Sequence, residues 1–313
     1  MQAPDPARTV HVGRDGWLFL IGGTNSVLIQ YRRLSWHFLR IRSWARLIRQ
    51  RNARAQALGI RCVQTIVPEK LSIYDNFTDG LRYDPARSPA RRLAHRLMGL
   101  AGFVDLVAPL RAARDETELY RRTDTHWSYD GCHIAYRALM RACGAVPLPD
   151  IDSRPRFTTE GIWDLGEKLP GQPRETVTHW TLDRNAVRAW ASPRVEAYEA
   201  AGRISELHVG AHVIYRNASP DADPRTVMLF GDSCAHFTHT LLTGFLAESF
   251  AELHFIWSSS IDWAHVERVR PDILMFEMAE RFMARIPVDD FDVEAADRAP
   301  TDLSAPHEAA AAA

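Results

Sequence analysis

The sequence lacks several features that mark particular classes of protein. It has four cysteines but no C-x-x-C pair, which argues against a zinc ribbon or a thioredoxin-like site. No run of about 18 apolar residues is present, so no membrane-spanning helix is predicted. Basic and acidic residues nearly balance, at 38 and 39, which argues against generic nucleic-acid binding. No export signal is visible at the start, because residues 1–9 are polar and rich in proline.

The composition that remains is that of a globular protein, with 46% hydrophobic and 25% charged residues among 313. Charge is distributed unevenly, because residues 26–58 hold eight arginines and no acidic residue. This segment predicts a long helix that ends at Gly59, a common residue at helix C-termini. Its arginines predict either a solvated helix face or a contact with an anionic polysaccharide or membrane surface: Arg32, Arg33, Arg40, Arg42, Arg46 and Arg49.

The last third of the sequence alternates apolar strands with helical segments. Strands are predicted at 226–230, 253–257 and 273–276, and helices over 234–245 and 263–269. This alternation predicts an α/β fold in which a parallel sheet carries helices on both faces. Ligands of such sheets bind beyond the carboxyl ends of the strands, so residues that follow strands are candidates for function.

The rest of the chain is expected to complete one domain. Residues 1–12 predict a flexible N-terminus and residues 13–287 the domain itself, with 147–205 as an insertion or loop region. The acidic and then alanine-rich segment 288–313 predicts a disordered tail. Further strands are predicted at 17–21, 60–67, 103–106 and 207–215, and further helices at 87–100 and 129–143.

The strongest chemical signal is Gly231-Asp232-Ser233, which follows an apolar strand and opens a predicted helix. A serine at a helix N-terminus can attack a carbonyl while free N–H groups stabilise the oxyanion. Gly231 would permit the tight turn, and Asp232 supports it. The alternative is that Asp232 or Ser233 only caps the helix, since both residue types are good caps.

A second signal is Asp124-Thr125-His126, in which the acid and the histidine are two residues apart. In an extended segment such residues face the same side, so Asp124 could accept from one ring nitrogen of His126. The other nitrogen would then be free to take a proton from a serine. The alternative is a histidine held by a local carboxylate for structural reasons. Together the two signals favour a Ser-His-Asp site.

Several motifs occur in an order that resembles a known family. The motifs are Gly13-Arg14-Asp15-Gly16-Trp17-Leu18-Phe19, Asp124-Thr125-His126-Trp127-Ser128, Gly231-Asp232-Ser233, and Pro271 to Glu277 with Glu280-Arg281; Trp163 to Leu169 is a weaker match. Over residues 13–286 the chain resembles the alginate O-acetyltransferase (AlgX/AlgJ) family. The resemblance implies an SGNH-hydrolase-like, flavodoxin-like fold. It also implies that Ser233 is the nucleophile, His126 the general base and acid, and Asp124 the residue that orients His126.

The resemblance further implies an exopolysaccharide acceptor, an acetyl-donor membrane protein, polysaccharide assembly proteins and a periplasmic location. No cofactor beyond the acetyl donor is expected. No carbohydrate-binding module like that of longer members is expected after Ile286. The Ser233 N–H is one expected oxyanion donor, and no second donor is identifiable.

Other residues offer alternatives or additions to this site. His236 and His239 have His-x-x-His spacing, but no acidic third ligand stands at the usual distance, so no metal is predicted. His236 is a rival base for Ser233. Cys234 is a rival nucleophile, because helix N-termini lower thiol pKa values.

Candidates for substrate contact are Trp127, Trp163, Lys168 and Arg281, although tryptophans are more commonly part of a core or a cleft wall. Arg281 also stands four residues after Glu277, the spacing of a helical ion pair.

The function predicted from these residues is transfer of acetyl groups to hydroxyls of an exopolysaccharide. Two rival functions stay open. An esterase of the same fold would use water as the second acceptor, and a non-catalytic polysaccharide-binding or assembly protein would keep only the fold.

Overall fold

The computed structural model describes residues 9–33 and 35–299, which are built around a seven-stranded sheet of order β4-β3-β11-β9-β10-β8-β7. The strands are β3 (Arg61–Val67), β4 (Phe103–Val104), β7 (Ala186–Ala191), β8 (His212–Asn217), β9 (Asp223–Gly231), β10 (Phe250–Trp257) and β11 (Ile273–Ala279). The first five strands of that order are parallel, which confirms the predicted parallel sheet, while β8 and β7 add an antiparallel edge.

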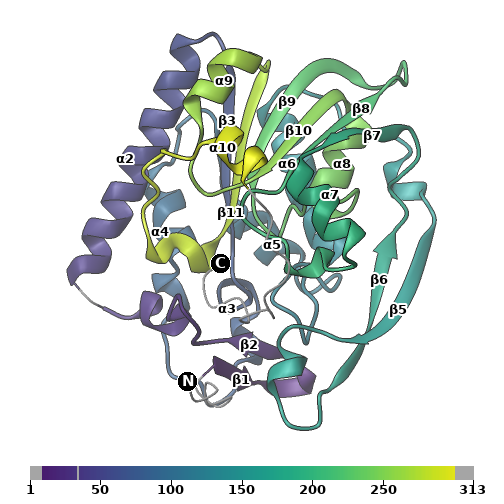
Figure 1. Ribbon diagram of the computed structural model, residues 1–313. Helices are drawn as coiled ribbons and strands as arrows, with labels where there is room; N and C mark the ends of the chain where they lie inside the picture. The colour runs from purple at the N-terminus through teal and green to yellow at the C-terminus, as the bar shows by residue number, and fades with distance from the viewer. Residues whose placement is uncertain (1–8, 34, 300–313) are drawn as a thin grey trace.

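Helices lie on both faces of this sheet, as predicted (Figure 1). They are α2 (Ser35–Ala57), α3 (Lys70–Ile73), α4 (Pro89–Arg96), α5 (Val107–Ala113), α6 (Tyr129–Ala142), α7 (Pro193–Ala200), α8 (Leu241–Ser249), α9 (Trp263–Val269) and α10 (Val293–Arg298). In Figure 1, α2 and α9 lie on one side of the sheet and α6 and α8 on the other. Within the described residues, no helix combines the length and apolar character needed to cross a membrane.

The arginine-rich helix is shorter than its sequence predicts. A 3-10 helix, η2 (Val27–Tyr31), precedes α2, and Arg32 between them is extended, so the prediction of one helix from Ser26 is wrong at its start. The prediction of its end is confirmed, because Gly59 has a φ of +75°, a conformation that glycine adopts without strain. The face of α2 that carries Trp44 and Ile48 is fully buried against the sheet.

The helix predicted after Ser233 starts later than expected. Asp232 O accepts the N–H of His236 and closes a single turn. His236 then takes a left-handed φ of +63°, which ends the turn, and α8 begins only at Leu241. Ser233 therefore lies in a tight loop that follows β9, and not at the N-terminus of a helix.

The region 147–205 contains strands and a helix, so the prediction that it consists mainly of loops is wrong. It contains an antiparallel hairpin of β5 (Arg156–Ile162) and β6 (Arg174–Trp180), and its strand β7 joins the edge of the main sheet. A buried carboxylate on α8 fastens the segment between β6 and β7. Glu248 accepts the backbone N–H groups of three consecutive residues, Arg184, Asn185 and Ala186.

Both ends of the described chain are also more ordered than predicted. Val10–Val12 form β1, which pairs with β2 (Leu18–Leu20) in a ribbon at the bottom of Figure 1. Near the other end, Asp289 accepts from the buried Arg51 of α2, and Val293 of α10 is buried. The predictions of disorder are therefore wrong for residues 9–12 and 288–298, and residues 1–8 and 300–313 lie outside the described part.

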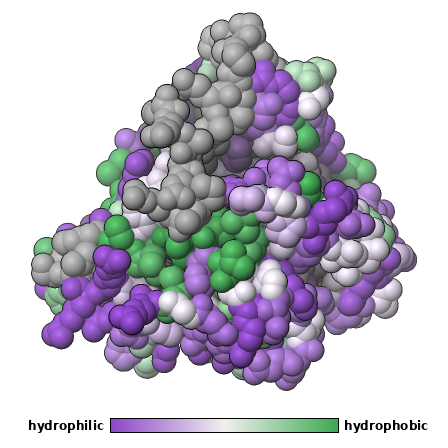
Figure 2. All heavy atoms as spheres, turned by 90° about the horizontal axis from the view of Figure 1, so that it is seen from below, coloured by the Kyte–Doolittle hydropathy of each residue, from purple (hydrophilic) through white to green (hydrophobic). Residues whose placement is uncertain are grey.

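The face seen from below carries polar and charged residues around an apolar patch (Figure 2).

Candidate active site

The serine turn, residues 231–236, follows the carboxyl end of β9, where ligands of α/β sheets bind. Ser233 is half-buried, and within the described residues neither its hydroxyl nor its N–H has a hydrogen-bond partner. Gly231 leads into the turn and is tightly surrounded, because a Cβ at this position would lie 3.1 Å from the Phe255 ring and 3.2 Å from Glu277 Oε2. The sequence predicted a glycine for a tight turn, and in the structure a side chain at this position would crowd its neighbours.

Two acids under the turn hold it in place. Asp232 Oδ1 accepts from Cys234 N at 2.8 Å, and Oδ2 accepts from Ala279 N at 2.7 Å, at the end of β11. Glu277 Oε2 accepts from Asp232 N at 3.2 Å. Burial and the Asp232 charge raise the pKa of Glu277 well above its ordinary value, so its charged form is disfavoured. The supporting role predicted for Asp232 thus rests on hydrogen bonds to the turn itself and to β11.

The histidine loop, residues 119–128, is a narrow hairpin that brings Asp124 and His126 to its tip. A bridge between Tyr120 and Trp127 closes the hairpin. Asp124 Oδ1 accepts from His126 N at 3.0 Å and lies 2.6 Å from His126 Nδ1. The pair therefore meets through a turn in which the aspartate caps the backbone two residues on, and not through the extended segment that the spacing suggested.

The electrostatics of the pair favour a basic histidine. Burial alone would raise the pKa of Asp124, but the charge and hydrogen bonds of His126 and the charge of Arg121 hold it far below its ordinary value. Burial alone would lower the pKa of His126, but the Asp124 charge and hydrogen bond outweigh it and raise that pKa above its ordinary value. With Nδ1–H directed at Asp124, the neutral ring keeps its lone pair on Nε2.

A direct hydrogen bond joins the histidine loop to the serine turn. Trp127 Nε1 donates to Cys234 O at 2.9 Å, so the residue after His126 is fixed to the residue after Ser233. His126 Nε2 is buried and has no hydrogen-bond partner in the described part of the chain. A half-buried serine hydroxyl and an oriented imidazole thus lie on two segments that are tied together, with Asp124 behind the imidazole.

Comparison with known proteins shows the family and the fold of this chain. A model of the family described as an SGNH hydrolase-like domain, acetyltransferase AlgX, matches residues 10–259. The chain belongs to this family. Two relatives are each named probable alginate O-acetylase AlgJ. The protein from Pseudomonas fluorescens is 27% identical over 154 residues, 48% of this chain and 37% of that one. The protein from Pseudomonas syringae pv. tomato is 30% identical over 123 residues, 37% and 31% of the two chains.

The matches thus span about a third of the length of these curated relatives. Solved structures show the fold of the family. The O-acetyltransferase domain of Pseudomonas putida AlgJ superposes with a TM-score of 0.55 at 17% identity, over 92% of this chain and 98% of that domain. Bacillus cereus PatB1 gives 0.60 at 12% identity, over 88% and 97%. Pseudomonas aeruginosa AlgX gives 0.53 at 15%, over 92% and 66%. These likenesses confirm the predicted SGNH-like fold class.

Within this family fold, the β5–β6 hairpin braces the histidine loop through two acids that the sequence analysis did not single out. Asp164 accepts from Thr125 N at 2.8 Å and from its hydroxyl at 2.5 Å. Glu175 accepts from the N–H groups of Arg122 and Thr123, both at 2.7 Å. Only Asp164 lies in a segment, 163–169, that had been noted as a weak match. Neither acid is near the loop in sequence, so spacing gives no signal for either.

The N-terminal ribbon braces the opposite side of the loop. The Lys70 ammonium is buried and donates to Arg121 O at 3.0 Å and Arg122 O at 2.8 Å. The rings of Trp17 and Phe19 each lie 5.7 Å from Lys70 Nζ, and burial lowers the pKa of Lys70 to about 8. The motif at residues 13–19 therefore packs around the lysine that holds the histidine loop.

Two of the predicted substrate contacts are wrong in this structure, because the side chains are buried in other roles. Trp127 has no exposed surface. Arg281 is 7% exposed, and its guanidinium donates to Glu69 Oε1 at 2.9 Å, so the predicted ion pair with Glu277 is also wrong. Glu277 lies in β11 and Arg281 in the 3-10 helix η8 (Glu280–Ala284), so the two residues do not share a helix.

The other two predicted contacts stay accessible. Trp163 is half-buried, with Nε1 donating to Glu175 O at 3.1 Å and the Arg121 guanidinium 5.0 Å from its ring. Lys168 is exposed and donates to Asp164 O at 2.6 Å. Both lie on the segment that carries Asp164, beside the histidine loop.

The rival base and the rival nucleophile are poorly placed for those roles. His236 Nδ1 accepts from Thr238 N at 3.1 Å, so the proton of the neutral ring is on Nε2 and the ring has no free lone pair for Ser233. Burial and the charges of His126 and His208 lower the pKa of His236 to about 4. Cys234 is buried, and burial raises the pKa of its thiol well above the ordinary value. His239 instead faces Glu248 at 3.3 Å, so His236 and His239 do not share a site.

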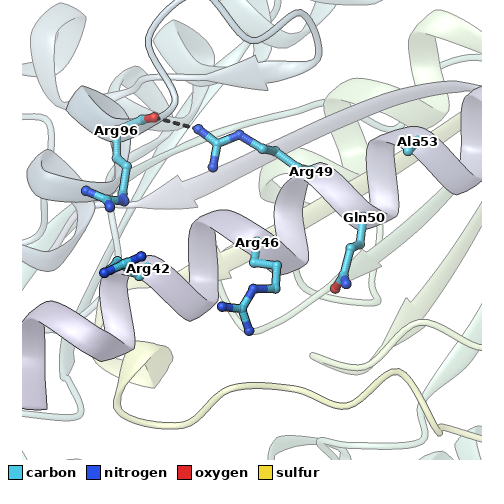
Figure 3. A pocket seen from close by; sticks show the side chains of 6 residues that line it. All are labelled: Arg42, Arg46, Arg49, Gln50, Ala53 and Arg96. Carbon is cyan, nitrogen blue, oxygen red and sulfur yellow. Dashed lines mark hydrogen bonds between the residues drawn. The ribbon is translucent and has the colours of Figure 1, made fainter.

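The basic groove lies on the solvent side of α2, apart from the histidine loop and the serine turn. It is a cavity of about 400 Å³ lined by Arg42, Arg46, Arg49, Gln50, Ala53 and Arg96 (Figure 3). Arg49 donates to Arg96 O at 2.9 Å, and no acidic side chain lines the groove. The opposite face of α2 is buried, so the predicted division into a buried and a solvated face is confirmed.

Proposed function

We propose that this chain is an O-acetyltransferase that carries acetyl on Ser233 and passes it to a hydroxyl group of an alginate-like exopolysaccharide. The observation that carries the proposal is the Asp124–His126 pair, whose free Nε2 belongs to a loop hydrogen-bonded to the serine turn. Membership of the SGNH hydrolase-like acetyltransferase family supports it.

In the first half-reaction, His126 Nε2 takes the proton of the Ser233 hydroxyl as Oγ attacks the acetyl carbonyl of the donor. The tetrahedral intermediate collapses, the bond to the donor's leaving group breaks, and that group takes the proton from His126. Asp124 stabilises the imidazolium that exists between these two events. The product is an acetyl ester on Ser233.

The Ser233 N–H is the first donor to the oxyanion, because it has no acceptor in the described part of the chain. We assign the second donor to His236 Nε2–H. Ser233 and His236 belong to one turn, which the hydrogen bond from His236 N to Asp232 O closes. The hydrogen bond from Thr238 leaves the ring proton on Nε2, and the lowered pKa keeps the ring neutral.

In the second half-reaction, the acceptor hydroxyl loses its proton to His126 and attacks the acetyl ester. Ser233 Oγ leaves and recovers that proton, which restores the starting state. The cycle uses no cofactor beyond the acetyl donor. An esterase would run the same cycle with water in place of the sugar hydroxyl.

The partners follow from the relatives named as alginate O-acetylases. We propose a periplasmic setting in which a membrane protein delivers acetyl and assembly proteins present the polymer. Of the four substrate contacts predicted from the sequence, Trp163 and Lys168 are accessible, and we assign these two residues to acceptor binding. The basic groove on α2 offers a second contact for an anionic chain, and binding of anionic vesicles would assign it to the membrane surface instead.

The test is acetyl transfer from a chromogenic acetyl ester, with and without oligosaccharides of uronic acid. Wild type, Ser233→Ala and His126→Ala are compared with Ser153→Ala, an exposed serine outside the site. We expect acceptor-dependent turnover, acetylated sugar, and an acetyl group on the Ser233 peptide in wild type and the control only. Turnover that no acceptor raises would identify an esterase. A wild type that binds polymer without turnover would identify a binding protein.

A further inference from the structure

Three histidines from distant parts of the chain form a cluster that the proposed mechanism does not use. His212 lies in β8, His254 in β10 and His265 in α9, and all three are buried. One ring nitrogen of each lies within 4.8 Å of the others. The cluster is on the α9 side of the sheet, because His254 is in register with Met228 and Leu274, whereas Glu277 under the serine turn faces the other side.

Each histidine of the cluster has one satisfied ring nitrogen and one that is not. His212 Nδ1 lies 3.1 Å from Asp297 Oδ2, and His254 Nε2 lies 2.9 Å from Glu252 Oε1. The opposite nitrogens, His212 Nε2 and His254 Nδ1, are buried without a partner among the described residues, as is His265 Nε2. Buried polar atoms are nearly always hydrogen-bonded, so three orphan nitrogens in one cluster require an occupant.

The surroundings match those of a metal ion. Histidines that ligate metals characteristically direct their other ring nitrogen at a carboxylate, as His212 and His254 do here. Asp297 Oδ1, next to the oxygen that faces His212, is also buried and without a partner among the described residues.

We propose that His212, His254 and His265 bind one Zn²⁺ ion through His212 Nε2, His254 Nδ1 and His265 Nε2, with water in the fourth position. Three imidazoles without thiolates suit a borderline ion such as Zn²⁺, and three ligands plus water complete a tetrahedron. Zinc bonds of about 2.0–2.1 Å place neighbouring ligand atoms about 3.3 Å apart, so the rings close inward slightly on binding. Asp297 and Glu252 supply negative charge next to the ion.

His265 must change its proton position when the ion binds. Arg268 donates to His265 Nδ1 at 2.8 Å, which places the proton of the neutral ring on Nε2 in the metal-free protein. Ligation through Nε2 moves that proton to Nδ1 and turns Arg268 away, with no net proton lost. The Arg268 side chain is half exposed and also pairs with Glu294, so it can leave. Arg268 therefore weakens zinc binding.

The ion would join β8, β10 and α9 directly and α10 through Asp297. We assign the ion a structural role, because His254 faces the opposite side of the sheet from Glu277, which supports the serine turn. Ligand binding to the folded chain alone stabilises it, so the metal should raise the melting temperature.

The experiment uses tag-free chain treated with a chelator, then titrated with Zn²⁺ and, separately, with Co²⁺, whose visible absorption reports four-coordinate geometry. We expect one ion per chain and a rise in Tm of about 5 °C at 100-fold excess over the Kd. His254→Ala and His265→Ala should each weaken binding by at least about 100-fold, beyond the 10- to 100-fold loss typical of outer-shell changes. His133→Ala removes a histidine from an aromatic cluster elsewhere and should bind as wild type does.

Two further variants distinguish zinc binding at this cluster from general destabilisation and from zinc binding at His126. Arg268→Ala should bind Zn²⁺ more tightly than wild type, a gain that general destabilisation does not produce. His126→Ala should leave the stoichiometry unchanged. The proposal is overturned if wild type binds no zinc at micromolar concentration, if His254→Ala keeps the zinc-dependent rise in Tm, or if His126→Ala abolishes binding. A crystal soaked in Zn²⁺ that shows only water between the rings also overturns it.

Discussion

The serine turn and the histidine loop are held to the fold by different means. The serine turn is bonded to the neighbouring strand β11, since its own Asp232 accepts from Ala279 N and Glu277 of β11 accepts from Asp232 N. The histidine loop has no partner of this kind in the central strands. The loop is hydrogen-bonded to Lys70, which follows β3, and to two acids of the β5–β6 hairpin, Asp164 and Glu175.

This difference separates stability from activity. The serine turn lies at the carboxyl end of a central strand, so loss of its supporting hydrogen bonds should destabilise the protein as well as inactivate it. The histidine loop is positioned by charged contacts from outside the central sheet, so damage there should displace His126 while the core stays folded. The predictions below change one contact at a time in the two regions.

The largest effect is expected at Asp124. In Asp124→Asn the amide no longer fixes the Nδ1–H tautomer, and acetyl transfer should fall by about 10⁴-fold, as in other triads. His126 must be neutral to act as base, so wild-type kcat/KM should rise with pH through a midpoint above 6.5, because Asp124 raises the pKa of His126. In the variant burial dominates and the midpoint should move to lower pH. A pH–rate profile from pH 5 to 9 checks both expectations, and an unmoved midpoint would contradict the assignment.

His236 tests the other half of the site, with a smaller effect. Loss of one oxyanion donor typically lowers kcat by about 10²- to 10³-fold, so His236→Ala should fall in that range with KM little changed. His236→Gln retains an N–H donor and should recover part of the rate. Single-turnover acetylation of Ser233 measures the step directly. If His236→Ala acetylates Ser233 at the wild-type rate, His236 is not the second donor.

Much of the serine turn could be predicted from the sequence, because its determinants are local. A strand, a glycine and Asp232-Ser233 follow one another, and the partner strand β11 was predicted too. The start of the next helix was predicted wrongly, because no propensity indicates that His236 adopts a left-handed conformation. The contact between Asp124 and His126 was predicted from an extended segment, whereas the two residues meet in a turn.

The supports of the histidine loop could not be predicted, because they are separated from it in sequence. Glu175 stands 53 residues after Arg122, whose N–H it accepts, and Lys70 stands 51 residues before Arg121, whose carbonyl it binds. The histidine cluster is a similar case, since His212, His254 and His265 have no motif spacing and meet only because β8 and β10 pair. Strand pairing and loop docking determine which distant residues meet, and neither can be predicted from local periodicity in the sequence.

A matched pair of charge-neutral substitutions compares the two regions directly. Glu175 accepts three hydrogen bonds from Arg122 N, Thr123 N and Thr123 Oγ1, so Glu175→Gln leaves donors facing an amide NH₂. Because the loop can move while the core stays folded, that variant should lose about tenfold in kcat but less than about 1 kcal/mol of unfolding free energy. Burial disfavours the charged form of Glu277, and the amide oxygen in Glu277→Gln can still accept from Asp232 N, so this variant should lose less than about 1 kcal/mol and keep the rate within about twofold.

Urea denaturation and steady-state kinetics on the same preparations measure both variants. Equal losses of kcat in the two variants would show that the two regions are held alike.

The smallest effect on activity is expected at Lys70. In Lys70→Met the two carbonyl groups of the histidine loop lose their donor, but a buried charge is also removed, so stability at pH 7 should change by less than about 1 kcal/mol and kcat by about threefold. The pKa of Lys70 is lowered to about 8, so the folded chain releases this proton before the unfolded chain does. Between pH 8 and 10.5 the unfolded state holds more protons, and wild type should gain stability relative to the variant as pH rises, on the order of 3 kcal/mol. Urea midpoints for both proteins at pH 7, 8.5 and 10 give this difference. A constant difference across that range would mean that Lys70 is not confined beneath the histidine loop in solution.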